Sequence, residues 1–157
     1  MPGTGIPPQP YYEEVTRFAV STPGTSISIK LTPDELRRMK KFVVIEMIYS
    51  LAANGDFVIN FNGDSGANYS RDTTTTATSF DPFVNIGIQG LLRLYITNVA
   101  TMEKIIDSQN MRFLSNAMFD DLFPGAWRNT VNNLEEFDFT ATQNFEAPTE
   151  VVIYTHD

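Results

Sequence analysis

Residues 55–70 read GDFVINFNGDSGANYS, and this stretch decides the fold class. Phe57, Ile59 and Phe61 recur at a period of two, which is the pattern of a strand with one buried face. A small polar turn follows the strand directly, and an aromatic residue, Tyr69, follows the turn. This order predicts a β fold that carries an elaborated loop.

Two dipeptides in the turn favour a tight reversal of the chain, Asn62-Gly63 and Ser65-Gly66. Glycine and asparagine adopt a positive φ at lower steric cost than other residues. We therefore expect positive φ at Gly63 and Gly66.

Other segments show the same alternation, with turn residues between them. Strands are predicted at residues 14–20, 25–31, 42–51, 56–61, 83–88, 91–98, 131–140 and 150–155. Residues 104–106 and 111–113 are further candidates, and residues 117–123 fit either a strand or a helical turn. Predicted connections are a long loop at 62–82 and turns at Gln89-Gly90 and Pro124-Gly125. The threonine-rich residues 73–79 fit an edge strand or a solvent-facing loop, and the loop is favoured.

One helix is expected directly after the second strand. Thr32 can cap it, Pro33 suits its first position, and the acidic pair Asp34-Glu35 lies where the helix dipole favours negative charge. Short strands, frequent turns and a single short helix predict an all-β protein, an antiparallel β-sandwich of jelly-roll type.

The chain of 157 residues fits one domain, which we place at residues 13–157. Residues 1–12 include four prolines and two glycines before the pair Tyr11-Tyr12, a composition that favours an extended, polyproline-like arm. This arm is either a disordered tail or a segment that docks on a neighbouring subunit through Tyr11 and Tyr12.

The bulk composition excludes several classes of partner. A net charge of −8 argues against binding nucleic acid, because neutralising phosphates supplies most of that affinity. The absence of cysteine excludes disulfides and thiolate metal sites. No apolar run approaches the length of a membrane span, and the N-terminus lacks the pattern of a signal peptide. We therefore expect a protein that stays in the cytoplasm where it is made, with no membrane span.

Catalytic chemistry has little support in the sequence. The single histidine is His156, so a Ser-His-Asp triad would need the end of the chain to be held in a site. Adjacent acidic pairs occur at 13–14, 120–121 and 135–136, but neighbours on a strand point to opposite faces. The chain is expected to be non-enzymatic and to need no cofactor.

The turn carries three side chains with oxygen ligands, Asn62, Asp64 and Asn68. Such a cluster suits calcium, but there is one carboxylate and no closing bidentate glutamate. The favoured interpretation is a turn whose side chains bond its own backbone, with no metal. Tyr69 and Trp127 have two interpretations: stacking on a sugar, or packing in the core or an interface.

Three segments carry a family resemblance: FNGDSGANYS at 61–70, WRNT at 127–130 and FDFTATQNF at 137–145. Together they resemble small β-sandwich virion proteins of phages and archaeal viruses. The resemblance implies that the turn is a structural hallmark without catalytic function. It implies a virion location and a structural role in capsid decoration, cement or a related component, with other capsid proteins and copies of itself as partners. The alternative is a receptor- or carbohydrate-binding module of a spike or fibre, which would recognise a glycan or receptor through residues 62–82 and 107–126.

Overall fold

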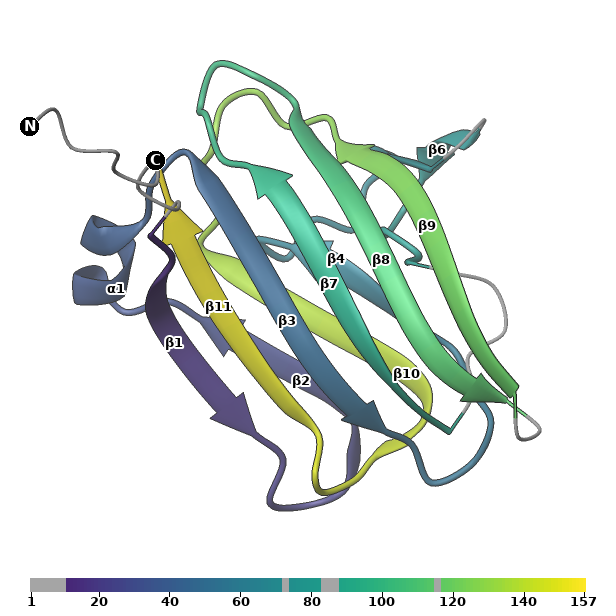
Figure 1. Ribbon diagram of the computed structural model, residues 1–157. Helices are drawn as coiled ribbons and strands as arrows, with labels where there is room; N and C mark the ends of the chain where they lie inside the picture. Colours follow the sequence, from purple (N-terminus) through teal and green to yellow (C-terminus); the bar gives the residue numbers. More distant parts are fainter. Residues whose placement is uncertain (1–10, 72–73, 83–87, 115–116) are drawn as a thin grey trace, which may run out of the picture.

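The computed structural model describes residues 11–71, 74–82, 88–114 and 117–157. Within these residues the chain forms two antiparallel sheets and one short helix (Figure 1). The strands are β1 (Glu13–Ala19), β2 (Gly24–Lys30), β3 (Phe42–Ser50), β4 (Phe57–Phe61), β5 (Tyr69–Arg71), β6 (Thr74–Ala77), β7 (Gln89–Thr97), β8 (Lys104–Leu114), β9 (Ala117–Trp127), β10 (Glu136–Phe145) and β11 (Glu150–His156), and the helix is α1 (Pro33–Arg38).

The two sheets form a sandwich, as predicted. The larger sheet has eight strands in the order β1-β11-β3-β7-β8-β9-β5-β6, and the smaller has three in the order β2-β10-β4. Figure 1 shows the smaller sheet behind the larger one, and none of the described helices and strands covers the other face of the larger sheet. We call this open side the outer face. The strand order confirms an all-β sandwich with one short helix, but it does not confirm jelly-roll connectivity.

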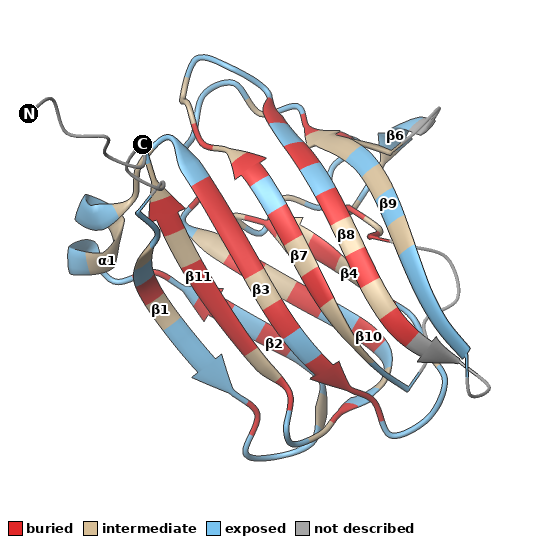
Figure 2. Ribbon diagram, in the orientation of Figure 1, coloured by how far each residue is buried: buried red, intermediate tan, exposed pale blue. Residues whose placement is uncertain are grey.

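The core lies between the sheets. Figure 2 shows buried residues gathered along the central strands β11, β3, β7 and β8. Aromatic rings fill much of this space, and the largest fully buried side chains include Tyr49, Phe57, Phe61, Tyr69, Phe80, Trp127, Phe137, Phe139 and Phe145. Phe57, Ile59 and Phe61 all point inward from β4, which confirms the alternation on which the fold prediction rested.

The helix α1 begins with the predicted cap. The Thr32 hydroxyl accepts from the Glu35 backbone N–H, and the Glu35 side chain accepts from the Thr32 backbone N–H, so the two residues form a capping box. Within the described residues no helix has the length and apolar character to cross a membrane.

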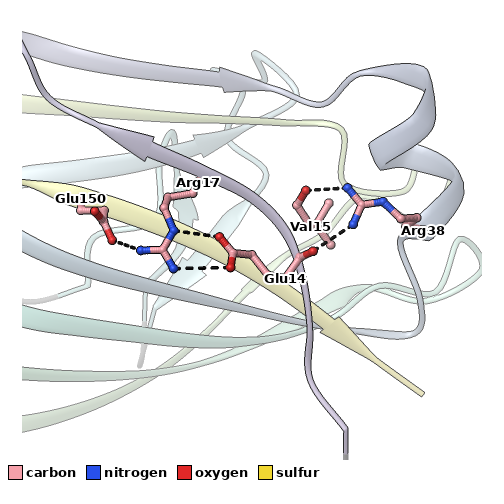
Figure 3. A network of polar contacts seen from close by, with 5 residues as sticks. All are labelled: Glu14, Val15, Arg17, Arg38 and Glu150. Carbon is pink, nitrogen blue, oxygen red and sulfur yellow. Dashed lines mark hydrogen bonds and ion pairs between the residues drawn. The ribbon is translucent and has the colours of Figure 1, made fainter.

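The helix is tied to the start of β1 through Arg38. Figure 3 shows its guanidinium donating to the backbone oxygens of Glu14, at 2.9 Å, and Val15, at 2.8 Å. On the same strand Arg17 pairs with Glu14 and reaches across to Glu150 on β11. The chain is therefore fixed in place just after Tyr12.

Two predicted turns prove to be parts of strands. Gln89-Gly90 begins β7, and Pro124-Gly125 lies near the end of β9. Among the described residues, β5 pairs with β9 at 125–127 and not at Pro124, and proline is tolerated in a strand where no neighbour needs its N–H. A Cβ on Gly90 would lie 2.6 Å from the Met111 backbone oxygen, so this glycine permits close packing where the sequence suggested a reversal.

Other boundaries also differ from the prediction. The expected loop at 62–82 contains β5 and β6, and Thr74–Ala77 is an edge strand, the less favoured interpretation. Residues 104–106 and 111–113 belong to one strand, β8, while 117–123 lie in β9. The strand predicted at 131–140 runs instead from Glu136 to Phe145. Most of the strand predicted at 83–88 lies outside the described residues.

Candidate functional site

The polar turn after β4 reverses the chain in the way that its sequence predicts. Asn62 has φ 52° and Gly63 has φ 67°, and the Asp64 backbone N–H donates to the Phe61 oxygen at 2.9 Å. Two central residues with positive φ are typical of a type I′ turn. The expectation of positive φ at Gly66 was wrong, because Gly63 is the only glycine in the described residues with that conformation.

Asp64 is the centre of the polar network in this turn. Its carboxylate accepts from the Trp127 indole Nε1 at 2.7 Å, the Gly66 backbone N–H at 2.9 Å and the Asn68 amide at 3.0 Å. Burial disfavours the charged carboxylate, but the bonds from Trp127, Gly66 and Asn68 outweigh it and hold the pKa of Asp64 below its ordinary value. The Asp64 backbone oxygen also accepts, from the Asn60 amide at 2.7 Å.

Tyr69 ties the turn to the end of β4. Its hydroxyl accepts from the Phe61 backbone N–H at 2.9 Å and donates to the Asp64 backbone oxygen at 2.9 Å. Burial raises the pKa of Tyr69 to about 12. The ring stacks beside Trp127, with 6.5 Å between centroids.

Asn62 connects the same turn to the segment before β10. Its side-chain oxygen accepts from the backbone N–H groups of Glu135, at 2.8 Å, and Glu136, at 3.0 Å, and its amide donates to the Asn133 oxygen at 2.8 Å. These bonds explain why β10 begins at Glu136, later than the sequence pattern suggested.

A buried lysine lies on the far side of the indole. Lys104 is fully buried, and its ammonium donates to the backbone oxygens of Val99, Met102 and Asn129 at 3.0–3.2 Å. It also lies 5.9 Å from the centre of the Trp127 ring. Burial lowers the pKa of Lys104, but three acceptors satisfy its three donors.

The turn thus brings together five of the residues singled out from the sequence: Asn62, Asp64, Asn68, Tyr69 and Trp127. The Asp64 carboxylate is already bonded to three protein donors, which supports the backbone-bonding interpretation of the turn. Among the residues that the structure describes, no three Asp, Glu or His side chains gather as a metal site would require. Tyr69 and Trp127 are fully buried, so neither ring presents a face to a sugar.

The remaining predicted residues, Tyr11 and Tyr12, directly precede β1, which lies at the other edge of the large sheet from β5 and β6. Tyr11 is 78% exposed. Tyr12 contacts the ring of His156 edge-on at 4.7 Å, and His156 stacks on Phe42 at 5.0 Å. His156 belongs to β11 and pairs with Phe42 on β3, so strand pairing holds this residue in place.

No protein-family model matches this chain, and no curated protein or solved structure shows significant similarity to it. Functional inference therefore depends on the surface of the molecule itself.

The outer face of the large sheet carries large apolar side chains that are exposed. In the pairs Phe42-Val43 and Ile105-Ile106, the second residue is buried in the core, while Phe42 is 41% and Ile105 55% exposed. Strands that are apolar on both faces are typical of sheets covered on both sides. Large exposed apolar residues on this face are Phe42, Ile48, Tyr95, Ile105, Met118 and Leu122.

Two adjoining hollows, of about 230 and 170 Å³, cross this face. They share Val44 and Tyr95, and we call them together the aromatic groove, lined by Tyr12, Phe42, Val44, Tyr95, Tyr154 and His156. The groove follows from the register, because Val44 pairs with Tyr154 on one side and Tyr95 on the other. A small residue between two tyrosines leaves a depression.

Sequence reasoning missed this groove, although consecutive apolar pairs in β3, β7 and β8 were a usable signal. The alternative of a binding module placed a recognition loop at residues 107–126, where the described residues instead belong to the paired strands β8 and β9.

Proposed function

We propose that this protein is a non-enzymatic structural subunit of a virion, a capsid decoration or cement protein that assembles with copies of itself and with other capsid proteins. The observation that carries the proposal is the apolar outer face. Exposed apolar patches of this kind mark contact surfaces in soluble proteins. The polar network around Asp64 fits the same role, because it holds the sandwich rigid and leaves its side chains little capacity for chemistry.

The virion assignment has its support in the resemblance of residues 61–70, 127–130 and 137–145 to small virion sandwiches. Proteomic detection of the chain in purified virus particles, at a constant ratio to the major capsid protein, is the expected result. Finding it only in the unassembled fraction would contradict the virion assignment while leaving self-assembly open.

Self-assembly is tested by the mass in solution as a function of protein concentration. Ile48, on the outer face, is 54% exposed, and Val131, outside the sheets, is 78% exposed. Ile48→Glu should dissociate the assembly, because a charge would be buried in the interface. Val131→Glu adds the same charge elsewhere and should leave the mass unchanged. A wild-type mass that stays monomeric at every concentration would contradict the proposal.

Ionic strength gives a second measure of the same surface. Subunits with a net charge of −8 repel one another, and salt screens that repulsion. Assembly through an apolar face should therefore become stronger as salt is added. Assembly that weakens with salt would instead indicate an interface made of ion pairs.

A further inference from the structure

The aromatic groove has the chemistry of a site for a proline-rich strand. Proline-rich segments in polyproline II conformation dock in grooves lined by aromatic rings. Here Tyr95 and Tyr154 flank Val44, and the stacked rings of Phe42 and His156 continue the apolar lining.

We infer that the groove binds the proline-rich segment Gly5–Pro10 of a second copy of this chain. The segment reads GIPPQP, and its prolines favour the polyproline II conformation that such grooves accept. This inference rests on the proposed self-assembly and names the contact that would hold two copies together.

The charge of this segment makes it a more favourable occupant of the groove than most other parts of the chain. The groove is bordered by the carboxylates of Glu46 and Asp107, and the subunit as a whole carries a charge of −8. Residues 2–10 contain no acidic side chain. The segment can therefore approach the groove without the like-charge repulsion that another acidic surface would meet.

The position of Tyr12 favours a second copy over the chain's own segment. β1 begins beside the end of β11, at the rim of the large sheet (Figure 1), and Arg38 fixes that point. The groove crosses the strands, so the chain's own segment would have to bend across them immediately before Tyr12. Tyr11 is exposed, and Pro10 limits the backbone at that position.

The reach of the segment is sufficient for contact with a neighbour. The six residues of the segment in polyproline II conformation span about 19 Å. A globular domain of this size has a radius of gyration of about 15 Å. Residues 5–10 can therefore extend from the rim of one subunit onto the outer face of the next.

The absence of cysteine makes disulfide mapping a direct test. One preparation carries Gln9→Cys and another carries Ile105→Cys, in the lining of the groove. After mixing and mild oxidation, a covalent dimer containing one chain of each kind is expected. Gln9→Cys mixed with Val131→Cys is the matched control, because Val131 is exposed but lies outside the groove. This mixture should give no covalent dimer that contains one chain of each kind. Wild-type synthetic peptide of residues 4–12 should compete and reduce the dimer.

Light scattering on the same samples separates the possible failures. An assembled sample with no mixed dimer above the control would overturn the inference while the proposed self-assembly stands. The double variant Gln9→Cys/Ile105→Cys adds a further check, because a disulfide confined to single chains would show that each segment occupies its own groove and would also overturn the inference. A sample that never assembles would overturn both proposals.

Discussion

The Trp127 indole donates a hydrogen bond of 2.7 Å to the Asp64 carboxylate, across 63 positions of sequence. The bond joins the turn after β4 to the end of β9, so it links the small sheet to the large one. The Trp127 ring lies 5.7 Å from the Phe61 ring and 5.9 Å from the ammonium of Lys104. A lone tryptophan and a lone turn carboxylate therefore act as one structural unit.

Asp64→Asn should destabilise the protein by about 1–3 kcal/mol at neutral pH, because an amide is a weaker acceptor than a carboxylate. The lowered pKa of Asp64 fixes the pH dependence. Its contribution is complete above the unfolded-state pKa of about 3.9 and is lost as pH falls through the lower folded-state value. Urea unfolding should show a difference in free energy between wild type and variant that narrows as the pH falls below the unfolded-state pKa.

Asp120→Asn is the matched control, because this substitution removes the same charge at a residue that is exposed on β9. It should change the free energy of unfolding by less than about 0.5 kcal/mol. An Asp64 variant that behaves like this control at neutral pH would show that the carboxylate does not hold the turn.

Trp127→Ala should cost about 3–5 kcal/mol, because it leaves a large cavity beneath the turn. Trp127→Phe should cost less, since it keeps a ring but removes the donor to Asp64. Chemical denaturation followed by circular dichroism measures both, as the variants lose the only tryptophan. A Trp127→Ala protein of wild-type stability that has lost binding on a glycan array would restore the sugar-stacking interpretation.

The sequence predicted those parts of the fold that depend on local physics. Alternation identified β4, Thr32 and Glu35 marked the start of α1, and Asn62-Gly63 located a tight turn. It did not predict that Asn62 would bond residues 133–136, because that contact depends on the pairing of β4 with β10, which lie far apart in the sequence.

Glycine caused several errors in the predictions made from the sequence. It can either supply a positive φ in a turn or permit close packing within a strand, and the sequence pattern does not separate these two roles. Gly63 supplies a positive φ in a turn. Gly90 and Gly125 lie within strands, where a Cβ would collide with Tyr49 or Phe80. The distinction depends on which large side chain packs over the glycine, and only the folded structure reveals that.

Gly125→Ala tests this close packing. A Cβ at this position would lie 2.6 Å from the Ser70 backbone oxygen, which β5 holds in place. Overpacking of this kind costs about 1–3 kcal/mol. Gly24→Ala is the control, since a Cβ on this strand glycine meets nothing within 4 Å, and its melting temperature should equal or slightly exceed that of wild type. Equal stabilities for the two variants would contradict the packing assigned to Gly125.

Tyr69→Phe should remove the acceptor of the buried Phe61 backbone N–H and destabilise the protein by about 1–3 kcal/mol. Burial raises the pKa of Tyr69 to about 12. A raised pKa means that this contribution is complete below the unfolded-state value of about 10 and is lost as pH rises toward 12. Wild type should therefore lose stability between about pH 10 and pH 12, and Tyr69→Phe should lose less stability over the same range.

Tyr11→Phe, at an exposed position, is the control and should match wild type in urea unfolding at each pH. If Tyr69→Phe instead retained the full alkaline loss, the buried hydroxyl of Tyr69 would not be its source.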